Sequence, residues 1–420
     1  MSATTSEPRL ATLMLRVYLP FAAAYFLSYL YRAVNSVVGP LIAGELDLSA
    51  TELGLLTSAY FIMFSLIQVP MGVALDRFGP RLVQAVLLVI AACGAALFGI
   101  GGSMAVLVAG RVLIGLGVAA GLMGALKVIT LWFRAEHWPM MNGLLMAAGG
   151  LGSLMATAPT QAALGVISWH SVFFVLSGMT LAVAALLYVA VPEKPGTRAG
   201  GTLAQQMTIV GGIMRDGYFW RMLPFFAAQQ ATFIAVQTLW IGPWLRDVAG
   251  LDPAARGQVM FWVALAMTLG FLSSGVVAGL ATRIGVSNFA TGTVVLSAFV
   301  AMTGALAAVS ADWLPLWTAL PLWCAFGFLG SYVIVYYPVL TKAFPLEVSG
   351  RVTTSVNFLM FSTVFAVQWG VGRVLDLFAP NATGGYAPAG YACALLLLTV
   401  LQVAAVVWLL VSPAVPQTQR

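Results

Sequence analysis

Long apolar stretches alternate with short polar ones along nearly the whole chain. Each stretch is close to the length of about 20 residues that a helix needs to cross a hydrocarbon layer of about 30 Å. They lie at residues 17–42, 52–74, 82–102, 104–131, 139–164, 171–191, 220–246, 254–280, 288–308, 314–341, 351–375 and 389–411. The pattern predicts an all-α membrane protein with 12 transmembrane helices.

One longer polar stretch divides these spans into two sets of six. It covers residues 192–219, opens with Pro-Glu-Lys-Pro-Gly, and has room for one short amphipathic helix near 202–214. We expect a six-helix bundle at 1–191, a cytoplasmic linker at 192–219 and a second six-helix bundle at 220–420.

The two sets of spans resemble each other in sequence. Gly39-Pro40 in the first set matches Gly242-Pro243 in the second, and Gly54 matches Gly257 at the same offset. A parallel duplication joined by a linker is typical of secondary transporters, whose binding site lies between the halves near the middle of the membrane.

Composition excludes a soluble globular protein. The 420 residues are 61% hydrophobic and 8% charged, whereas a soluble chain is about 25% charged, and the mean hydropathy is +0.98. The 19 basic residues outnumber the 13 acidic ones, and most fall in loops on the linker side. This bias places both termini in the cytoplasm, in a multi-pass protein of the cell (inner or plasma) membrane. We therefore expect a lipid bilayer, and no nucleic acid, to be the partner of these basic loops.

The loop after the second span carries a motif of the form G-x-x-x-D-R-x-G-x-R. Its residues are Gly72, Asp76, Arg77, Gly79 and Arg81. Gly72 permits close helix approach, Gly79 permits a tight turn, and Asp76 can accept hydrogen bonds from the N-terminal amides of a facing helix. The motif resembles the signature of the major facilitator superfamily. The resemblance implies gating residues whose Asp76 docks on the eleventh span, near residues 351–354, and closes the cytoplasmic side.

A second motif lies on the fourth span, where Arg111, Gly115 and Gly117 form R-x-x-x-G-x-G. It resembles another common motif of that superfamily, one that is frequent in drug:proton antiporters. The fifth span departs from the antiporter pattern, because Pro159 follows its glycines at a distance. An exporter stays open as an alternative.

One arginine lies in the middle of the first apolar stretch. Arg32 follows Arg16 by 16 residues, about 24 Å along a helix, and Tyr25, Tyr29 and Asn35 share its face. A charge at this depth costs about 2.5–3.5 kcal/mol. All 13 acidic residues fall in loops, tails or span ends, so none is available to neutralise it. We expect Arg32 to bind an anionic substrate.

The string Tyr-Arg-x-x-Asn-Ser around Arg32 resembles the anion:cation symporter and organophosphate antiporter branches. That resemblance implies a first-helix arginine that meets the anionic group of the substrate, and a basic fourth-helix residue at the place of Lys127. Their seventh-helix arginine is replaced here by Ala235 and Val236, which favours a carboxylate over a phosphate ester. Lys127 also lies near the cytoplasmic boundary, where it can simply extend to the interface.

Further polar and aromatic residues are candidates for the wall of the same cavity. They are Gln230, Gln237 and Trp240 on the seventh span, Tyr332 and Tyr336 on the tenth, and Asn357 on the eleventh. Aromatic stripes more often pack than bind, but the glutamines among them favour a polar wall lined for an organic anion.

Taken together, these patterns predict a secondary active transporter that moves a small carboxylate-bearing anion by alternating access. No nucleotide-binding motif is present, so we expect coupling to a proton or another ion, a monomeric state, and no cofactor or metal. The alternatives are an exporter of drugs, siderophores or metabolites, or a non-transporting membrane scaffold or sensor. An enzyme is not expected, because the spans lack a nucleophile–base pair.

Overall fold

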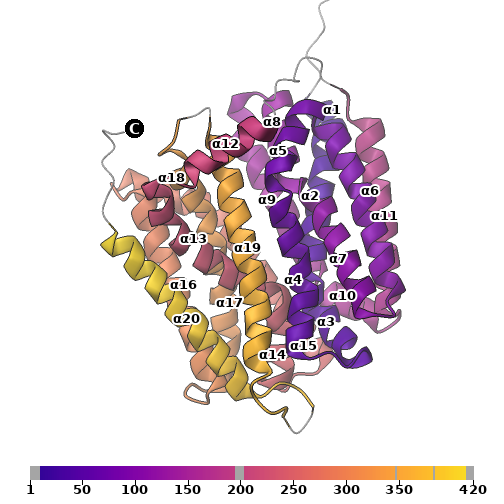
Figure 1. Ribbon diagram of the computed structural model, residues 1–420, viewed down its shortest axis with the longest axis vertical. Helices are drawn as coiled ribbons and strands as arrows, with labels where there is room; N and C mark the ends of the chain where they lie inside the picture. The colour runs from indigo at the N-terminus through magenta and orange to yellow at the C-terminus, as the bar shows by residue number, and fades with distance from the viewer. Residues whose placement is uncertain (1–9, 194–202, 346–347, 382–383, 413–420) are drawn as a thin grey trace, which may run out of the picture.

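The computed structural model describes residues 10–193, 203–345, 348–381 and 384–412, and all regular structure within them is helical (Figure 1). The first half comprises α1 (Leu10–Leu13), η1 (Met14–Tyr18), α2 (Leu19–Ala33), α3 (Asn35–Glu45), α4 (Ala50–Leu66), α5 (Gln68–Phe78), α6 (Pro80–Ile100), α7 (Met104–Val118), α8 (Gly121–Trp132), η2 (Ala135–His137), α9 (Trp138–Met155), α10 (Ala158–Leu164) and α11 (Trp169–Ala190).

A linker helix, α12 (Leu203–Ile213), lies close to the amphipathic helix expected near 202–214. The second half comprises α13 (Gly217–Ala235), η3 (Val236–Trp240), α14 (Ile241–Asp247), α15 (Pro253–Arg283), α16 (Asn288–Ser310), η4 (Leu316–Thr318), α17 (Ala319–Gly330), η5 (Ser331–Val335), α18 (Tyr336–Thr341), α19 (Ser349–Leu375) and α20 (Pro388–Val411).

Every predicted span has a helical counterpart in the described chain. Ten helices are long and apolar enough to cross a membrane, and α4 with α5 forms an eleventh span bent by 50°. The broken segment Gly217–Asp247 corresponds to the seventh predicted span. The predicted all-α membrane fold is confirmed.

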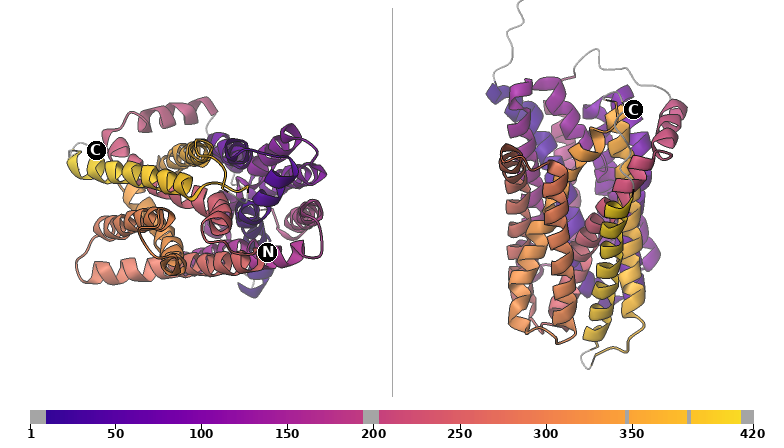
Figure 2. Two further views of the ribbon diagram at one scale, coloured as in Figure 1. Left: turned by 90° about the horizontal axis from the view of Figure 1, so that it is seen from below. Right: turned by 90° about the vertical axis from the view of Figure 1, so that its left-hand side faces the viewer.

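The two halves stand side by side, with the first half on the right of Figure 1 and the second on the left. Helix α12 lies across one end of the molecule, together with α5 and α8, and the view along the bundle in Figure 2 shows it outside both halves. We call this the linker end. The opposite end, which carries α3, α10 and α14, is called the far end.

Helices α4 and α19 form the main contact between the halves. The ring centroids of Phe64 and Phe361 lie 4.4 Å apart, and the hydroxyls of Ser65 and Ser362 lie 2.9 Å apart. At Ile67, two residues after Ser65, the second span bends by 50°, so α4 and α5 lie against α19 in different directions.

At the far end the halves meet through backbone as well as side chains. Pro40 cannot donate to the Ser36 carbonyl one turn earlier, and a Cβ at Gly242 would collide with that carbonyl oxygen. A Cβ at Gly372 would likewise collide with the Ala50 carbonyl. Only glycine permits these approaches, so the matching Gly-Pro pairs of the two halves mark a place where the helices touch.

The N-terminus of α4 is capped twice at this end. Ser49 and Glu52 form a capping box, in which each side chain accepts from the backbone N–H group of the other residue. The carboxylate of Asp376, at the end of α19, accepts from the backbone N–H groups of Ala50 at 2.9 Å and Thr51 at 2.8 Å. A carboxylate at a helix N-terminus is stabilised by the helix dipole. Asp376 therefore ties the far end of one half to that of the other.

Candidate functional site

Arg32 lies two residues before the break between α2 and α3 at Val34, and its side chain reaches the interface between the halves. Its guanidinium carbon is 4.8 Å from the ring centroid of Tyr29, 5.5 Å from that of Phe64 and 5.4 Å from that of Phe361. Phe361 belongs to the second half, so the charge lies where the two halves face each other.

Within the described residues no carboxylate neutralises Arg32. Its Nε is enclosed without a hydrogen-bonding partner, while the side chain as a whole is partly exposed. The phenol groups of Tyr25, Tyr29 and Tyr60 lie close enough to interact with it electrostatically. An aromatic face attracts a cation by about 0.5–2 kcal/mol without accepting its N–H groups as a carboxylate would, and the neutral Tyr60 hydroxyl is placed to bond to the guanidinium as well.

The residues predicted to share the helix face of Arg32 differ in how their polar groups are used. Tyr25 donates to the Tyr29 hydroxyl at 3.3 Å, and their rings lie 5.0 Å apart. Asn35 follows the break and donates to Thr57 at 3.2 Å, so its amide nitrogen is used within the first half. Tyr60, Phe64 and Phe361 complete the surroundings of Arg32 and were not among the sequence candidates, because buried aromatics give the same signal as ordinary packing.

The tenth span contributes a tyrosine other than those expected. Tyr332 bonds to Ser273 at 2.9 Å and Tyr336 to Thr293 at 2.5 Å, so both hydroxyls are used inside the second half. Tyr337 instead donates to Asn357 of α19 at 2.6 Å. The 3₁₀ turn η5 precedes Tyr337. Each residue of a 3₁₀ helix turns the chain by about 120°, compared with about 100° in an α-helix, so the five residues of η5 rotate the following helix face by about 100° in total. Helical spacing alone therefore does not indicate Tyr337.

The candidates on the seventh span also differ in whether their polar groups already have a partner. Trp240 is buried and donates its indole N–H to the Gln368 carbonyl of α19 at 3.1 Å. Gln230 has an enclosed Oε1 with no partner. Gln237 is partly exposed and lies in the π-turn η3, which contacts α2 and α3. The two glutamines therefore remain candidates for the cavity wall, while the Trp240 N–H is already used.

The gating motif adopts a different pairing from the one expected. Asp76 Oδ1 lies 2.6 Å from Lys127 Nζ, which also donates to the Leu75 carbonyl at 2.7 Å. The expected contact with residues 351–354 is not made in the described chain: α5 and α12 both pack against α19, but the Asp76 carboxylate is bonded to Lys127 of α8. Lys127 thus lies with the gating residues at the linker end rather than with Arg32.

The other residues of this motif have local roles. Gly79 has a φ of +80°, which confirms the expected tight turn. A Cβ at Gly72 would meet no atom within 4 Å, so the expectation of close helix approach there is wrong. Arg77 is exposed and stacks on Phe78, and Arg81 donates to the Tyr188 carbonyl in the last turn of α11.

The motif on the fourth span supports the break next to Arg32. Arg111 is 1% exposed, stacks on Phe98 at 4.5 Å, and donates to the Tyr31 carbonyl at 3.2 Å. A Cβ at Gly115 would collide with the Tyr60 carbonyl, and one at Gly117 with α6. These residues hold α7 against the elements that carry the site.

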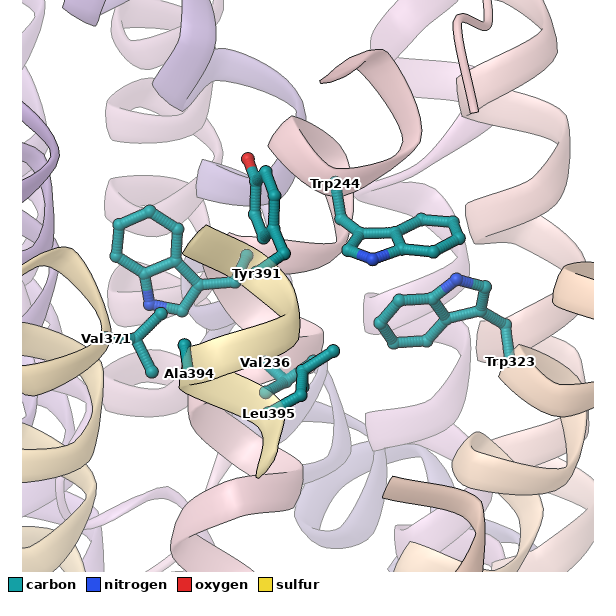
Figure 3. Close-up of a pocket in the computed structure, with 8 residues that line it drawn as sticks. Val236, Trp244, Trp323, Val371, Tyr391, Ala394 and Leu395 are labelled. Carbon is teal, nitrogen blue, oxygen red and sulfur yellow. The ribbon is translucent and has the colours of Figure 1, made fainter. Parts of the chain in front are cut away.

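A small cavity in the second half is unsuited to an anion. Trp244, Trp323 and Tyr391 surround it, with Val236, Val371 and Leu395 closing it (Figure 3). The lining is almost entirely apolar and carries no charged side chain. Within the described residues no group of three or more His, Cys, Asp or Glu could hold a metal ion.

Comparison with known proteins identifies the family. A family model described as Major Facilitator Superfamily matches residues 21–368. The chain belongs to this superfamily. It is therefore a multi-pass membrane protein of a family of transporters, as its spans, its duplication and its first motif predicted.

Several curated transporters resemble the chain along most of its length. The "Probable sulfoacetate transporter SauU" of Cupriavidus necator is 26% identical over 389 residues, which cover 86% of each chain. The "Hexuronate transporter" of Escherichia coli K12 is 26% identical over 381 residues, 83% of this chain and 85% of that one.

Solved structures share the fold. A D-xylose–proton symporter superposes with a TM-score of 0.72 at 18% identity, covering 97% of this chain and 99% of that one. A bacterial homologue of the human lysosomal transporter Spinster gives a TM-score of 0.70 at 19% identity, covering 94% and 96%.

Proposed function

We propose that this superfamily member is a secondary active transporter of a small organic anion, and that Arg32 binds the anionic group. The observation that carries the proposal is the Arg32 guanidinium at the interface of the halves, surrounded by Tyr29, Phe64 and Phe361 without a carboxylate in the described chain. A planar guanidinium binds a carboxylate or sulfonate with two parallel hydrogen bonds. The substrate would supply the negative charge that the protein lacks there.

The chemistry of the relatives agrees with this charge. Their names specify sulfoacetate and hexuronates, and both are organic acids. The seventh span has Ala235 and Val236 where the organophosphate branch has an arginine, so a single guanidinium faces the substrate. We infer a carboxylate-bearing metabolite.

We propose alternating access as the mechanism, with a structure that is closed at the far end. Support comes from the Gly242 and Gly372 contacts and from Asp376 on the N-terminus of α4. At the linker end, Asp76 is held by Lys127 instead of by α19. In the opposite state Asp76 would leave Lys127 for α19, while Asp376 would release α4.

We propose that the linker end faces the cytoplasm of an inner or plasma membrane. Most of the 19 basic residues lie on that side of the spans, in agreement with the positive-inside bias.

We also propose a proton as the coupling ion. The buried carboxylate of Asp247 is an unsuitable carrier, because it accepts from Arg246 at 2.6 Å and from the Tyr391 hydroxyl at 2.9 Å. Burial raises the pKa of neighbouring Tyr386 to about 12, so this phenol keeps its proton at neutral pH. The proton would then travel on the acid group of the substrate or at the Asp76–Lys127 pair.

Transport into proteoliposomes tests the proposal. Counterflow of labelled glucuronate, galactonate and sulfoacetate is compared with that of a cationic dye, with and without an inward proton gradient. We expect exchange of at least one acid, and we expect the proton gradient to accelerate it in a way that a protonophore reverses. Dye exchange without acid exchange would favour the exporter, and no exchange at all would favour a scaffold or sensor.

A further inference from the structure

Two side chains of the second half lie across the interface from Arg32. Asn357 precedes Phe361 by one turn of α19, so both side chains lie on the same helix face, and the Phe361 ring is 5.4 Å from the Arg32 guanidinium carbon. Tyr337 reaches the same place from α18, close enough to Arg32 and Tyr29 to interact with them electrostatically. The pair therefore lies opposite the anion-binding group.

The hydrogen bond between these two residues fixes the orientation of the amide. Tyr337 Oη lies 2.6 Å from Asn357 Oδ1, a distance typical of O–H···O and short for N–H···O. The amide oxygen thus accepts from Tyr337, and the NH₂ group points the other way.

The Asn357 NH₂ group is available to a ligand. Its nitrogen makes no hydrogen bond in the described chain. The nitrogen is also not enclosed by protein atoms, so it borders open space. Asn357 as a whole is only 6% exposed. An amide nitrogen has two donors and no acceptor, so this wall of the site offers donors only.

We propose that Tyr337 holds Asn357 as a hydrogen-bond donor to a second oxygen of the substrate. The inference rests on the proposed function and narrows its substrate class. The anchored acid would carry a hydroxyl, carbonyl or second acid group on the side that faces α19. Asn357 contacts the substrate, and Tyr337 is a positioning residue.

This arrangement discriminates against plain alkyl acids. A plain acid satisfies Arg32 but leaves the Asn357 NH₂ group without a partner once water is excluded. A missing hydrogen bond of this kind reduces affinity by about tenfold.

Binding to matched pairs of acids tests the inference. Dissociation constants are measured by calorimetry on the purified full-length transporter for gluconate against hexanoate, glucuronate against cyclohexanecarboxylate, and sulfoacetate against propanesulfonate. We expect the oxygen-rich member of at least one pair to bind about tenfold more tightly. In Tyr337→Phe and Asn357→Leu the ratio should fall below about threefold, with the affinity for the plain acid unchanged.

Two controls separate the possible failures. Tyr31→Phe removes a phenol that bonds to Thr180 inside the first half, and it should leave the ratio unchanged. Arg32→Gln should weaken both members of each pair. If Arg32→Gln has this effect but no pair is discriminated, or if Tyr337→Phe lowers both members equally, the inference is wrong and the proposed function stands. If Arg32→Gln changes neither member, or if none of the six acids binds, both are wrong.

Discussion

The Arg32 guanidinium and the Phe361 ring meet across the interface of the two halves, 5.4 Å apart. A cation–π contact of this kind recovers about 0.5–2 kcal/mol, whereas a central charge costs about 2.5–3.5 kcal/mol. The contact therefore orients the charge without neutralising it. Any movement of one half against the other changes this contact, which links substrate binding to the relative position of the halves.

Substitution of Gly372 by alanine should prevent closure of the far end. The added Cβ collides with the Ala50 carbonyl, and overpacking of this kind costs about 1–3 kcal/mol. Electron–electron resonance between spin labels at the exposed positions Val166 and Trp313, in a background without Cys93, Cys324 and Cys393, should show a shift to longer distances. Transport should fall at least about tenfold.

Gly370→Ala is the matched control for that variant. A Cβ at Gly370 meets no atom within 4 Å, so distances and transport should match the wild type. Identical behaviour of the two alanine variants would contradict the close approach of α4 and α19 at the far end.

Asp376→Asn should weaken the connection between α19 and α4. The variant keeps the shape but replaces two charge-assisted hydrogen bonds, worth about 1.5–3 kcal/mol each, by weaker neutral ones. We expect the far-end-open population in the same resonance experiment to rise about tenfold. The control is Asp312→Asn, at an exposed position of the far end whose φ of 58° asparagine tolerates. This variant should show no rise in the open population. An equal rise in both variants would indicate a general effect of charge.

Lys127→Met distinguishes a gating role from a binding role. Because Lys127 is bonded to Asp76 and Leu75, we expect turnover to fall about tenfold while the dissociation constant of the anion changes less than about threefold. The pair is partly exposed, so its loss should cost less than about 1 kcal/mol of stability. An affinity loss as large as that of an Arg32 variant would place Lys127 in the binding site after all.

Arg111→Leu should reduce stability more than affinity. The substitution leaves the Tyr31 carbonyl without its partner beside the break at Val34, at a cost of about 1–3 kcal/mol. A melting temperature lower by a few degrees in detergent is the expected result. An unchanged melting temperature together with lost binding would indicate direct contact of Arg111 with the substrate.

The sequence predicted the fold because its signals are strong and redundant. Each span is marked by length and hydropathy, the duplication by the Gly39-Pro40 and Gly242-Pro243 pairs, and the start of α4 by its capping box. Arg32 could be predicted as a candidate because it is a lone charge in an apolar stretch without an acid to match.

Details that depend on irregular helices could not be predicted. The 3₁₀ turn η5 shifts the face of the tenth span, so Tyr337 rather than Tyr336 meets Asn357. Asp76 bonds to Lys127 rather than to α19, and no periodicity in the sequence indicates this pairing. Phe361 carries no sign that distinguishes it from any other packed aromatic residue.

The most direct test of the central claim is the affinity of Arg32→Gln for the anion that the wild type exchanges best. Binding is followed by calorimetry, with Arg283→Gln, an exposed arginine near the linker end, as the control. Loss of a charge-assisted pair predicts an affinity at least about tenfold lower in Arg32→Gln and unchanged in Arg283→Gln. Wild-type affinity in Arg32→Gln would contradict the account.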